Sequence, residues 1–176
     1  MAKISITLSK IRLKQAEENL LDAKYLFERN SLKGANNRAY YSIFHTMKAI
    51  LAIEPMDFKR HKDVIAYFNQ NYINKEIFPR ELGHKIKNAE IIRDNSDYND
   101  FYIVSKNDTE NIIKTATELY SYGSNYIKKW CEDNNINFEI EEWNITYNFW
   151  YTTTTYLNYN KQDFCSLRGK EEKCSN

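Results

Sequence analysis

The sequence predicts an all-α protein: an antiparallel up-and-down bundle of four to five helices, followed by a C-terminal extension of uncertain structure. Its 176 residues contain only 4 Gly and 2 Pro, too few for a collagen-like chain, a Gly-rich linker or a many-turned β architecture. Apolar residues recur at steps of three and four in successive segments. Because short connections join neighbouring antiparallel helices, these segments predict a bundle. A hydrophobic fraction of 42% is enough for its core.

The first two predicted helices cover residues 8–29 and about 36–53. Ser9 suits the start of the first helix as a cap, and Gly34 is expected to follow its end. The apolar face of the first helix comprises Leu13, Ala16, Leu20, Ala23 and Phe27. That of the second comprises Ala39, Ile43, Met47, Ile50 and Leu51.

Three further helices are predicted, over residues 60–72, 79–93 and 105–130. Pro79 suits the first turn of the fourth helix because its fixed φ is helical, and Ser105 or Asp108 suits the cap of the fifth. Residues 94–104 are polar and aromatic and predict a loop. The expected inward residues are Val64, Ile65 and Phe68, then Leu82, Ile86, Ala89 and Ile91, then Ile112, Ala116, Leu119, Gly123 and Ile127.

A change of composition near residues 130–134 predicts two parts, a helical bundle over 1–130 and an extension over 131–176. The first part has 21 basic and 16 acidic residues, a net charge of +5, and the second has 4 and 8, a net charge of −4. A charge of +5 is modest for a nucleic-acid binder. For the extension, the sequence leaves three alternatives open: a packed segment, a hairpin on the bundle, or a poorly ordered appendage.

Several classes of protein are disfavoured. No apolar run approaches the roughly 20 residues that span a bilayer, and residues 1–10 lack a secretory apolar region, so we expect a cytoplasmic protein without a membrane partner. Cys131, Cys165 and Cys174 form no CxxC pair and predict free thiols. The histidines and carboxylates match no metal motif and there is no phosphate-binding Gly loop, so no metal and no cofactor are expected.

One strip of the second predicted helix carries residues suited to chemistry. Arg38 and His45 are seven residues apart, nearly two turns, which places them on one face about 10 Å apart. Ser42 lies between them in the sequence, four residues after Arg38 and three before His45. From spacing alone, a solvated face on which these side chains happen to align is the simpler interpretation. A shared catalytic or binding face is the alternative.

The same helix is part of a longer resemblance. Residues 37–45 have the sequence NRAYYSIFH, followed by HKDVI at 61–65, PREL at 79–82, and SDYNDF at 96–101 after an arginine at 93. In these features, over roughly residues 10–130, the chain resembles the small branch of HEPN-domain proteins whose second helix carries RAYYSxFH. The Arg-x4–6-His signature of that family corresponds here to Arg38-x6-His45.

The resemblance implies a helical bundle, usually a homodimer in which the motif faces of two subunits meet in one cleft. Many HEPN proteins are metal-independent RNases, often toxins whose antitoxin is a minimal nucleotidyltransferase. The function implied here is a metal-independent RNase of HEPN toxin type that cleaves RNA with Arg38 and His45. The alternative is a non-catalytic HEPN module that binds a nucleotide or a minimal nucleotidyltransferase partner. An unrelated helical interaction domain is a third interpretation.

The residues suit RNA cleavage without a metal. His45 can accept or donate a proton because the reference pKa of histidine is about 6.5. Arg38 can hold phosphate oxygens with its bidentate fork, and Ser42 can add a hydrogen bond. Tyr41 can stack on a base, although such aromatics more often pack inside the protein. His61 can reach the phosphate or is simply an exposed histidine at a helix start.

Two other pairs of residues suggest structural or surface roles. Arg80 and His84 are four residues apart in the fourth predicted helix, and the lysines beside His84 indicate a surface position. Arg93 and Asp97 are also four apart, and we expect an ion pair between them that orders the 94–104 loop.

Overall fold

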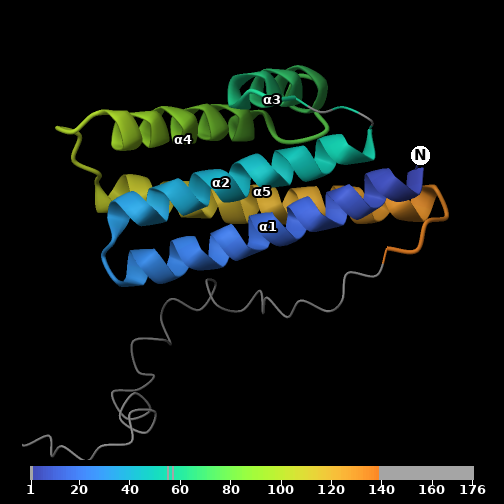
Figure 1. Cartoon of the computed structure of the whole chain (residues 1–176). Helices are drawn as coiled ribbons and strands as arrows, with labels where there is room; N and C mark the ends of the chain where they lie inside the picture. Colours follow the sequence, from blue (N-terminus) through green and yellow to red (C-terminus); the bar gives the residue numbers. More distant parts are fainter. Residues whose placement is uncertain (1, 55, 57, 139–176) are drawn as a thin grey trace, which may run out of the picture. The chain divides into compact units, whose positions relative to one another are not determined.

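A computed structural model describes residues 2–54, 56 and 58–138 of the chain. Its described part is an all-α bundle without strands, as predicted (Figure 1). The elements are α1 (Ala2–Glu28), α2 (Leu32–Ile53), α3 (His61–Phe68), the π-helix η1 (Asn69–Ile73), α4 (Arg80–Tyr98) and α5 (Lys106–Asp133).

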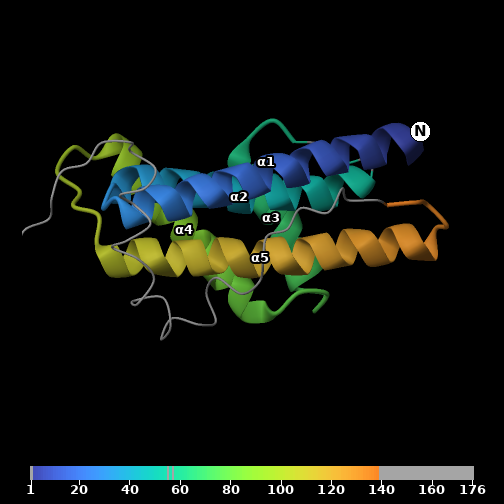
Figure 2. The same ribbon diagram turned by 90° about the horizontal axis from the view of Figure 1, so that it is seen from below.

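The helix α2 is the centre of the bundle because it packs against α1, α3, α4 and α5. Helices α1, α2 and α5 lie lengthwise beside one another, and α4 lies over α2 on the side away from α1 (Figures 1 and 2). The largest fully buried side chains, which form the core between these helices, are Tyr40, Tyr72, Phe68, Leu20, Ile43, Met47, Ile50, Leu51, Leu82, Ile86, Leu119 and Ile127.

The connection between α1 and α2 is a tight turn. Asn30 adopts a left-handed backbone conformation with φ 59°, which asparagine tolerates better than most residues. The N–H of Ser31 donates to the carbonyl of Leu26 at 2.8 Å. The predicted boundaries were wrong here: α2 begins four residues early, with Gly34 and Asn36 inside it, and α1 begins at residue 2 instead of residue 8.

Side chains of α1 fix its register against α2. The hydroxyl of Ser9 is fully buried and donates to the carbonyl of Ala49 at 2.8 Å. One turn further along α1, the guanidinium of Arg12 donates to the carbonyl of Lys48 at 3.0 Å. Because these bonds join residues that pair in reverse order, the two helices are antiparallel. Ser9 therefore lies inside α1 and does not cap it as predicted.

The region from α3 to α4 departs most from the sequence prediction. The predicted helix over residues 60–72 is divided into α3 and the five-residue π-helix η1. Residues 94–98, predicted as part of a loop, are the last turn of α4. In the same helix Ile92 is buried while Ile91 is 48% exposed, which corrects the predicted inward position of Ile91.

The last helix, α5, begins as predicted and packs closely on α2. Ser105 is its N-cap, and its hydroxyl accepts a hydrogen bond from the N–H of Asp108 at 3.0 Å. Gly123 is buried against α2, where an added Cβ would lie 2.7 Å from a methyl carbon of Thr46. The helix continues to Asp133, and Cys131 near its end is a fully buried free thiol.

The alternatives proposed for the extension concern residues that lie almost entirely outside those the structure describes, which end at residue 138. None of the described helices combines the length and the apolar character that a membrane crossing requires.

Candidate functional site

A strip along α2 holds three of the five residues predicted for a site. Arg38 is exposed, and Tyr41 and His45 are half-buried; we call these three residues the motif strip. The guanidinium of Arg38 donates to the side-chain oxygen of Asn19 on α1 at 3.3 Å. Among the described residues, Arg38 forms no ion pair. Its positive charge is therefore available to an anion.

Ser42 does not belong to the motif strip, although the sequence analysis placed it there. Its side chain is fully buried, and its hydroxyl has no hydrogen-bond partner among the described residues. Four helical residues turn through about 400°, so Ser42 lies about 40° round the helix from Arg38 and about 60° from His45. This rotation places it with the buried residues Thr46 and Ala49 on the inner side of α2.

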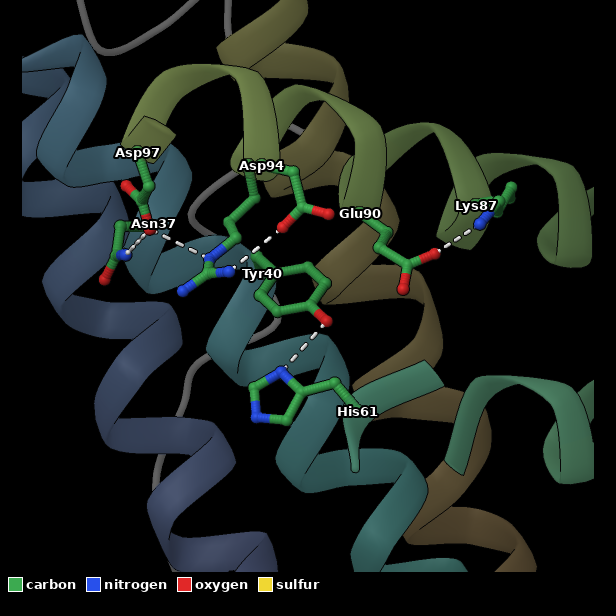
Figure 3. A network of polar contacts seen from close by, with 8 residues as sticks. Asn37, Tyr40, His61, Lys87, Glu90, Asp94 and Asp97 are labelled. Carbon is green, nitrogen blue, oxygen red and sulfur yellow. Dashed lines mark hydrogen bonds and ion pairs between the residues drawn. The ribbon is translucent and has the colours of Figure 1, made fainter. Parts of the chain in front are cut away.

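His61 is brought to the motif strip from the first turn of α3. Its ring stacks on Phe44 with centroids 3.9 Å apart and meets the edge of Tyr41 at 5.9 Å. Its Nδ1 atom lies 3.2 Å from the hydroxyl of the buried Tyr40, at hydrogen-bond distance (Figure 3). His61 is half-buried. The structure therefore does not support the simple exposed histidine of the sequence analysis.

His45 lies against the same aromatic side chains. Its ring centroid is 6.2 Å from that of Tyr41 and 5.7 Å from that of Phe44. Burial lowers the pKa of His45, and the nearby charges of Lys48, Arg12 and His61 lower it further. With its pKa below the usual 6.5, His45 is neutral at pH 7 and can accept a proton.

The pKa of His61 is also lowered, again chiefly by burial, with further contributions from Arg93 and Lys48. Two carboxylates, Asp94 and Glu90, act in the opposite direction. The two histidines therefore have different surroundings, because carboxylates oppose the lowering of the pKa only at His61.

Arg93 of α4 lies against the aromatic rings of Tyr40 and Tyr41. Its guanidinium lies 5.6 Å from the ring centroid of Tyr40 and 5.9 Å from that of Tyr41, within the range of cation–π attraction. The predicted ion pair with Asp97 is confirmed at 2.9 Å, and a second one joins Arg93 to Asp94 at 3.0 Å. The pair with Asp97 stabilises the last turn of α4 and not a loop.

Asp97 also connects α4 to α2. Its carboxylate accepts a hydrogen bond from the side-chain amide of Asn37 at 3.2 Å (Figure 3). Asn37 precedes Arg38 in the chain, so this bond fixes the position of α4 relative to the helix that carries the motif strip.

Helix α1 also contributes to the site, which the sequence did not predict. Arg12 lies close enough to His45 to lower its pKa, and Asn19 contacts Arg38. Arg12 and Asn19 are seven residues apart, the same interval as Arg38 and His45. That shared interval was a signal in the sequence, but it indicates a contact only once the register of α1 against α2 is known.

The remaining candidates lie elsewhere. His84 is exposed, as predicted, and together with Arg80 it lines a cavity of about 530 Å³ between η1 and α4. Arg80 forms an ion pair with Glu76 at 2.6 Å. Among residues 2–54, 56 and 58–138, no three His, Cys, Asp or Glu side chains are grouped as a metal ion would require.

Comparison with known proteins identifies the family. The model of the HEPN domain matches residues 9–126, which is more than half of the chain. The chain belongs to the HEPN family. The match contains the whole motif strip together with His61 and Arg93.

Individual relatives come from three different organisms. A protein of Methanocaldococcus jannaschii named "Putative toxin MJ0605" is 39% identical over 83 residues, covering 47% of this chain and 62% of that protein. A "UPF0332 protein" of Thermotoga maritima is 29% identical, covering 58% and 78%. A "UPF0332 protein" of Archaeoglobus fulgidus is 31% identical over 125 residues, covering 68% and 94%. The alignment with the Methanocaldococcus jannaschii protein therefore covers less than two thirds of the length of that protein.

Proposed function

We propose that this HEPN protein cleaves RNA without a metal ion, using Arg38 and His45. The observation that carries the proposal is the arrangement of the motif strip, in which an exposed guanidinium and a half-buried imidazole share one side of α2. A seven-residue interval places them about 10 Å apart along the helix axis. Long side chains at that interval can both reach one phosphodiester.

The proposed roles follow from charge and pKa. His45, kept neutral by its lowered pKa, removes the proton from a ribose 2′-hydroxyl. Arg38 binds the phosphate oxygens and stabilises the negative charge that grows on them as the 2′-oxygen attacks phosphorus. The products are a 2′,3′-cyclic phosphate and a 5′-hydroxyl. DNA resists cleavage because it lacks the attacking hydroxyl.

Tyr41 and His61 are proposed to contact the RNA beside these two residues. Both are half-buried, so part of each ring remains accessible to a base or a phosphate. Ser42 is left out because its hydroxyl is buried.

We propose two partners for the protein. One is a second copy of the chain, whose motif strip would face the first across a shared cleft. The other is a minimal nucleotidyltransferase that acts as antitoxin; the name "Putative toxin" of a relative that is 39% identical over 83 residues supports this assignment. Size-exclusion chromatography with light scattering tests the dimer, and co-purification of a co-expressed minimal nucleotidyltransferase tests the second partner.

The decisive experiment measures cleavage of single-stranded RNA in EDTA by the wild type and by Arg38→Ala and His45→Ala. We expect each substitution to slow cleavage by about 100-fold or more, in line with the usual contributions of acid–base and phosphate-stabilising groups. Arg38→Lys should recover only part of the rate because lysine lacks the bidentate fork. The matched controls are Arg80→Ala and His84→Ala, which change the same residue types at exposed positions of α4.

The outcomes separate the two functional interpretations. Equal cleavage by wild type and strip variants would mean a contaminating nuclease. A wild type that cleaves no RNA but binds a nucleotide or a nucleotidyltransferase would support the non-catalytic module instead.

A further inference from the structure

We propose that His61 is the second proton-transfer residue of this site, donating the proton that the 5′-oxygen leaving group needs while His45 accepts the proton of the 2′-hydroxyl. The inference rests on the proposed RNA cleavage. It adds that one subunit carries both the base and the acid, so that the proton transfers need no histidine from a second copy.

Two aromatic side chains each contact both histidines, and this arrangement supports the proposed role. Phe44 contacts both imidazoles, at centroid distances of 3.9 Å to His61 and 5.7 Å to His45. Tyr41 also contacts both, at 5.9 and 6.2 Å. Two imidazoles that touch the same two rings lie on one side of the molecule. A substrate bound over Tyr41 and Phe44 would therefore lie beside both imidazoles.

Tyr40 positions His61 in a way that suits a group that gains and loses a proton. Its hydroxyl lies 3.2 Å from Nδ1 of His61, and burial raises the pKa of Tyr40, so the phenol stays protonated. A hydroxyl can donate to Nδ1 of the neutral ring and accept from Nδ1–H of the charged ring. The neutral and the charged forms of His61 can therefore both keep the hydrogen bond to Tyr40. The other ring nitrogen, Nε2, is not used by this bond and can contact the substrate.

The charges around the two rings differ, although burial lowers the pKa of both. The groups that act on His45 are Lys48, Arg12 and His61, all of which disfavour its charged form. His61 has opposing neighbours: Arg93 and Lys48 disfavour its charged form, whereas Asp94 and Glu90 favour it. Of the two rings, His61 is the one with carboxylates nearby that favour its protonated form, although burial still holds its pKa below the usual value. The bound phosphate would add further negative charge beside it.

The step balances with these two residues alone. The 2′-oxygen forms a bond to phosphorus as its proton passes to the free ring nitrogen of His45. The bond from phosphorus to the 5′-oxygen breaks, and that oxygen takes the proton from Nε2 of His61. Afterwards His45 is charged and His61 is neutral, and exchange with water restores both. No oxidant, metal or other co-reactant takes part.

A substrate with a sulfur leaving group tests the assignment. In a 5′-bridging phosphorothiolate the departing group is a thiolate, whose conjugate acid has a pKa of about 8.5, so it leaves without being protonated. We expect His61→Ala to cleave ordinary RNA about 100-fold or more slowly than the wild type, and to cleave the sulfur substrate at nearly the wild-type rate. His45→Ala should be slow on both substrates, and His84→Ala should be normal on both.

Rescue by sulfur also shows that the variant is folded, because a misfolded protein would be slow on both substrates. As a second variant, His61→Gln keeps a polar side chain of similar length and should show the same rescue. Tyr40→Phe, which removes only the positioning hydroxyl, should shift the limb of the pH–rate profile that belongs to the acid and leave the limb of the base unchanged.

The results that overturn the proposal differ from those that overturn the function. If His61→Ala cleaves ordinary RNA at the wild-type rate, or is equally slow on both substrates, His61 is not the acid, while cleavage through Arg38 and His45 still stands. If the wild type cleaves neither substrate, both proposals fail.

Discussion

Replacing Gly123 by alanine tests how closely α5 packs on the helix that carries the motif strip. In the structure an added Cβ would lie 2.7 Å from Cγ2 of Thr46 and 3.1 Å from Cδ1 of Ile50. Thr46 cannot easily turn away, because its hydroxyl donates to the carbonyl of Ser42 at 2.9 Å and a β-branched side chain has few rotamers. The contact must therefore be relieved by separating α5 from α2.

Two opposing effects set the size of the change. Overpacking a well-filled core costs about 1–3 kcal/mol, and alanine in place of glycine inside a helix gains about 1 kcal/mol. Because Thr46 is held in place, we take the upper part of the overpacking range, which leaves a net loss of about 1–2 kcal/mol in the free energy of unfolding. With a urea m-value of about 2 kcal/mol/M, the midpoint falls by about 0.5–1 M.

Urea unfolding followed by circular dichroism measures this shift. Gly34→Ala is the matched control: it also lies in a helix, but its new Cβ would meet the flexible end of Leu26 at 3.2 Å, so its stability should be unchanged or higher. A double variant with Thr46→Ser removes the opposing methyl and should recover much of the loss, seen as a coupling energy in a double-mutant cycle. A midpoint for Gly123→Ala at or above that of the wild type would show that the α2–α5 contact is looser than described.

Two further predictions concern stability. Ser105→Ala should lower the free energy of unfolding by about 1 kcal/mol because it removes the N-cap bond of α5, whereas Ser31→Ala should have little effect because the Ser31 side chain makes no capping bond; urea unfolding compares the two. Glu17→Gln should stabilise the protein by about 1 kcal/mol at pH 7, because Glu17 is 3% exposed and one of its carboxylate oxygens is buried without a hydrogen-bond partner. Burial raises the pKa of Glu17, with a smaller contribution from Glu18, so its cost is absent below the unfolded pKa of about 4.5 and grows as the pH rises through the folded pKa. The advantage of the glutamine variant should therefore disappear in acid, and an advantage that is constant from pH 3 to pH 7 would contradict this explanation.

Features of the sequence that depend on local spacing predicted the structure well. The apolar stripes of α1 and α2 are buried at Leu13, Leu20, Ile43 and Met47, because a period of 3.6 residues fixes which side chains share a helix face. The cap at Ser105 was equally predictable, since a hydroxyl three residues before a free N–H needs no distant partner.

The end of α4 could not be predicted in the same way. Residues 94–97 have the sequence Asp-Asn-Ser-Asp, which is poor in helix-forming residues and favours a loop. The helix continues because Arg93 pairs with Asp97 one turn later and Asn37 bonds to Asp97 from α2. The first of these contacts was expected from the sequence, but the second depends on how α4 lies on α2.

The site shows the same division between local and distant information. Arg38 and His45 could be placed on one side of α2 from their spacing, and the rotation of about 40° that buries Ser42 follows from the same geometry once the covering helices are known. The partnership of His61 with Phe44 and Tyr40 had no local signal, because His61 belongs to a different helix.

The central position of α2 explains why its polar side chains point to function. A helix packed against four others is normally apolar around most of its circumference. Most buried residues of α2 are apolar, with Asn36, Ser42 and Thr46 as exceptions, and one side of the helix stays partly open. On that side an arginine remains exposed, and the pKa of a histidine is lowered by its surroundings. Position 38 is exposed and adds little to the core, whereas an apolar residue at position 45 would avoid burying an imidazole, so stability alone does not account for the pair Arg38 and His45. The backbone of α2 fixes the interval between them, whereas the position of His61 depends on how α3 docks. In the proposed mechanism, substitutions that loosen α3 should therefore impair departure of the leaving group, while the proposed phosphate binding at Arg38 is retained.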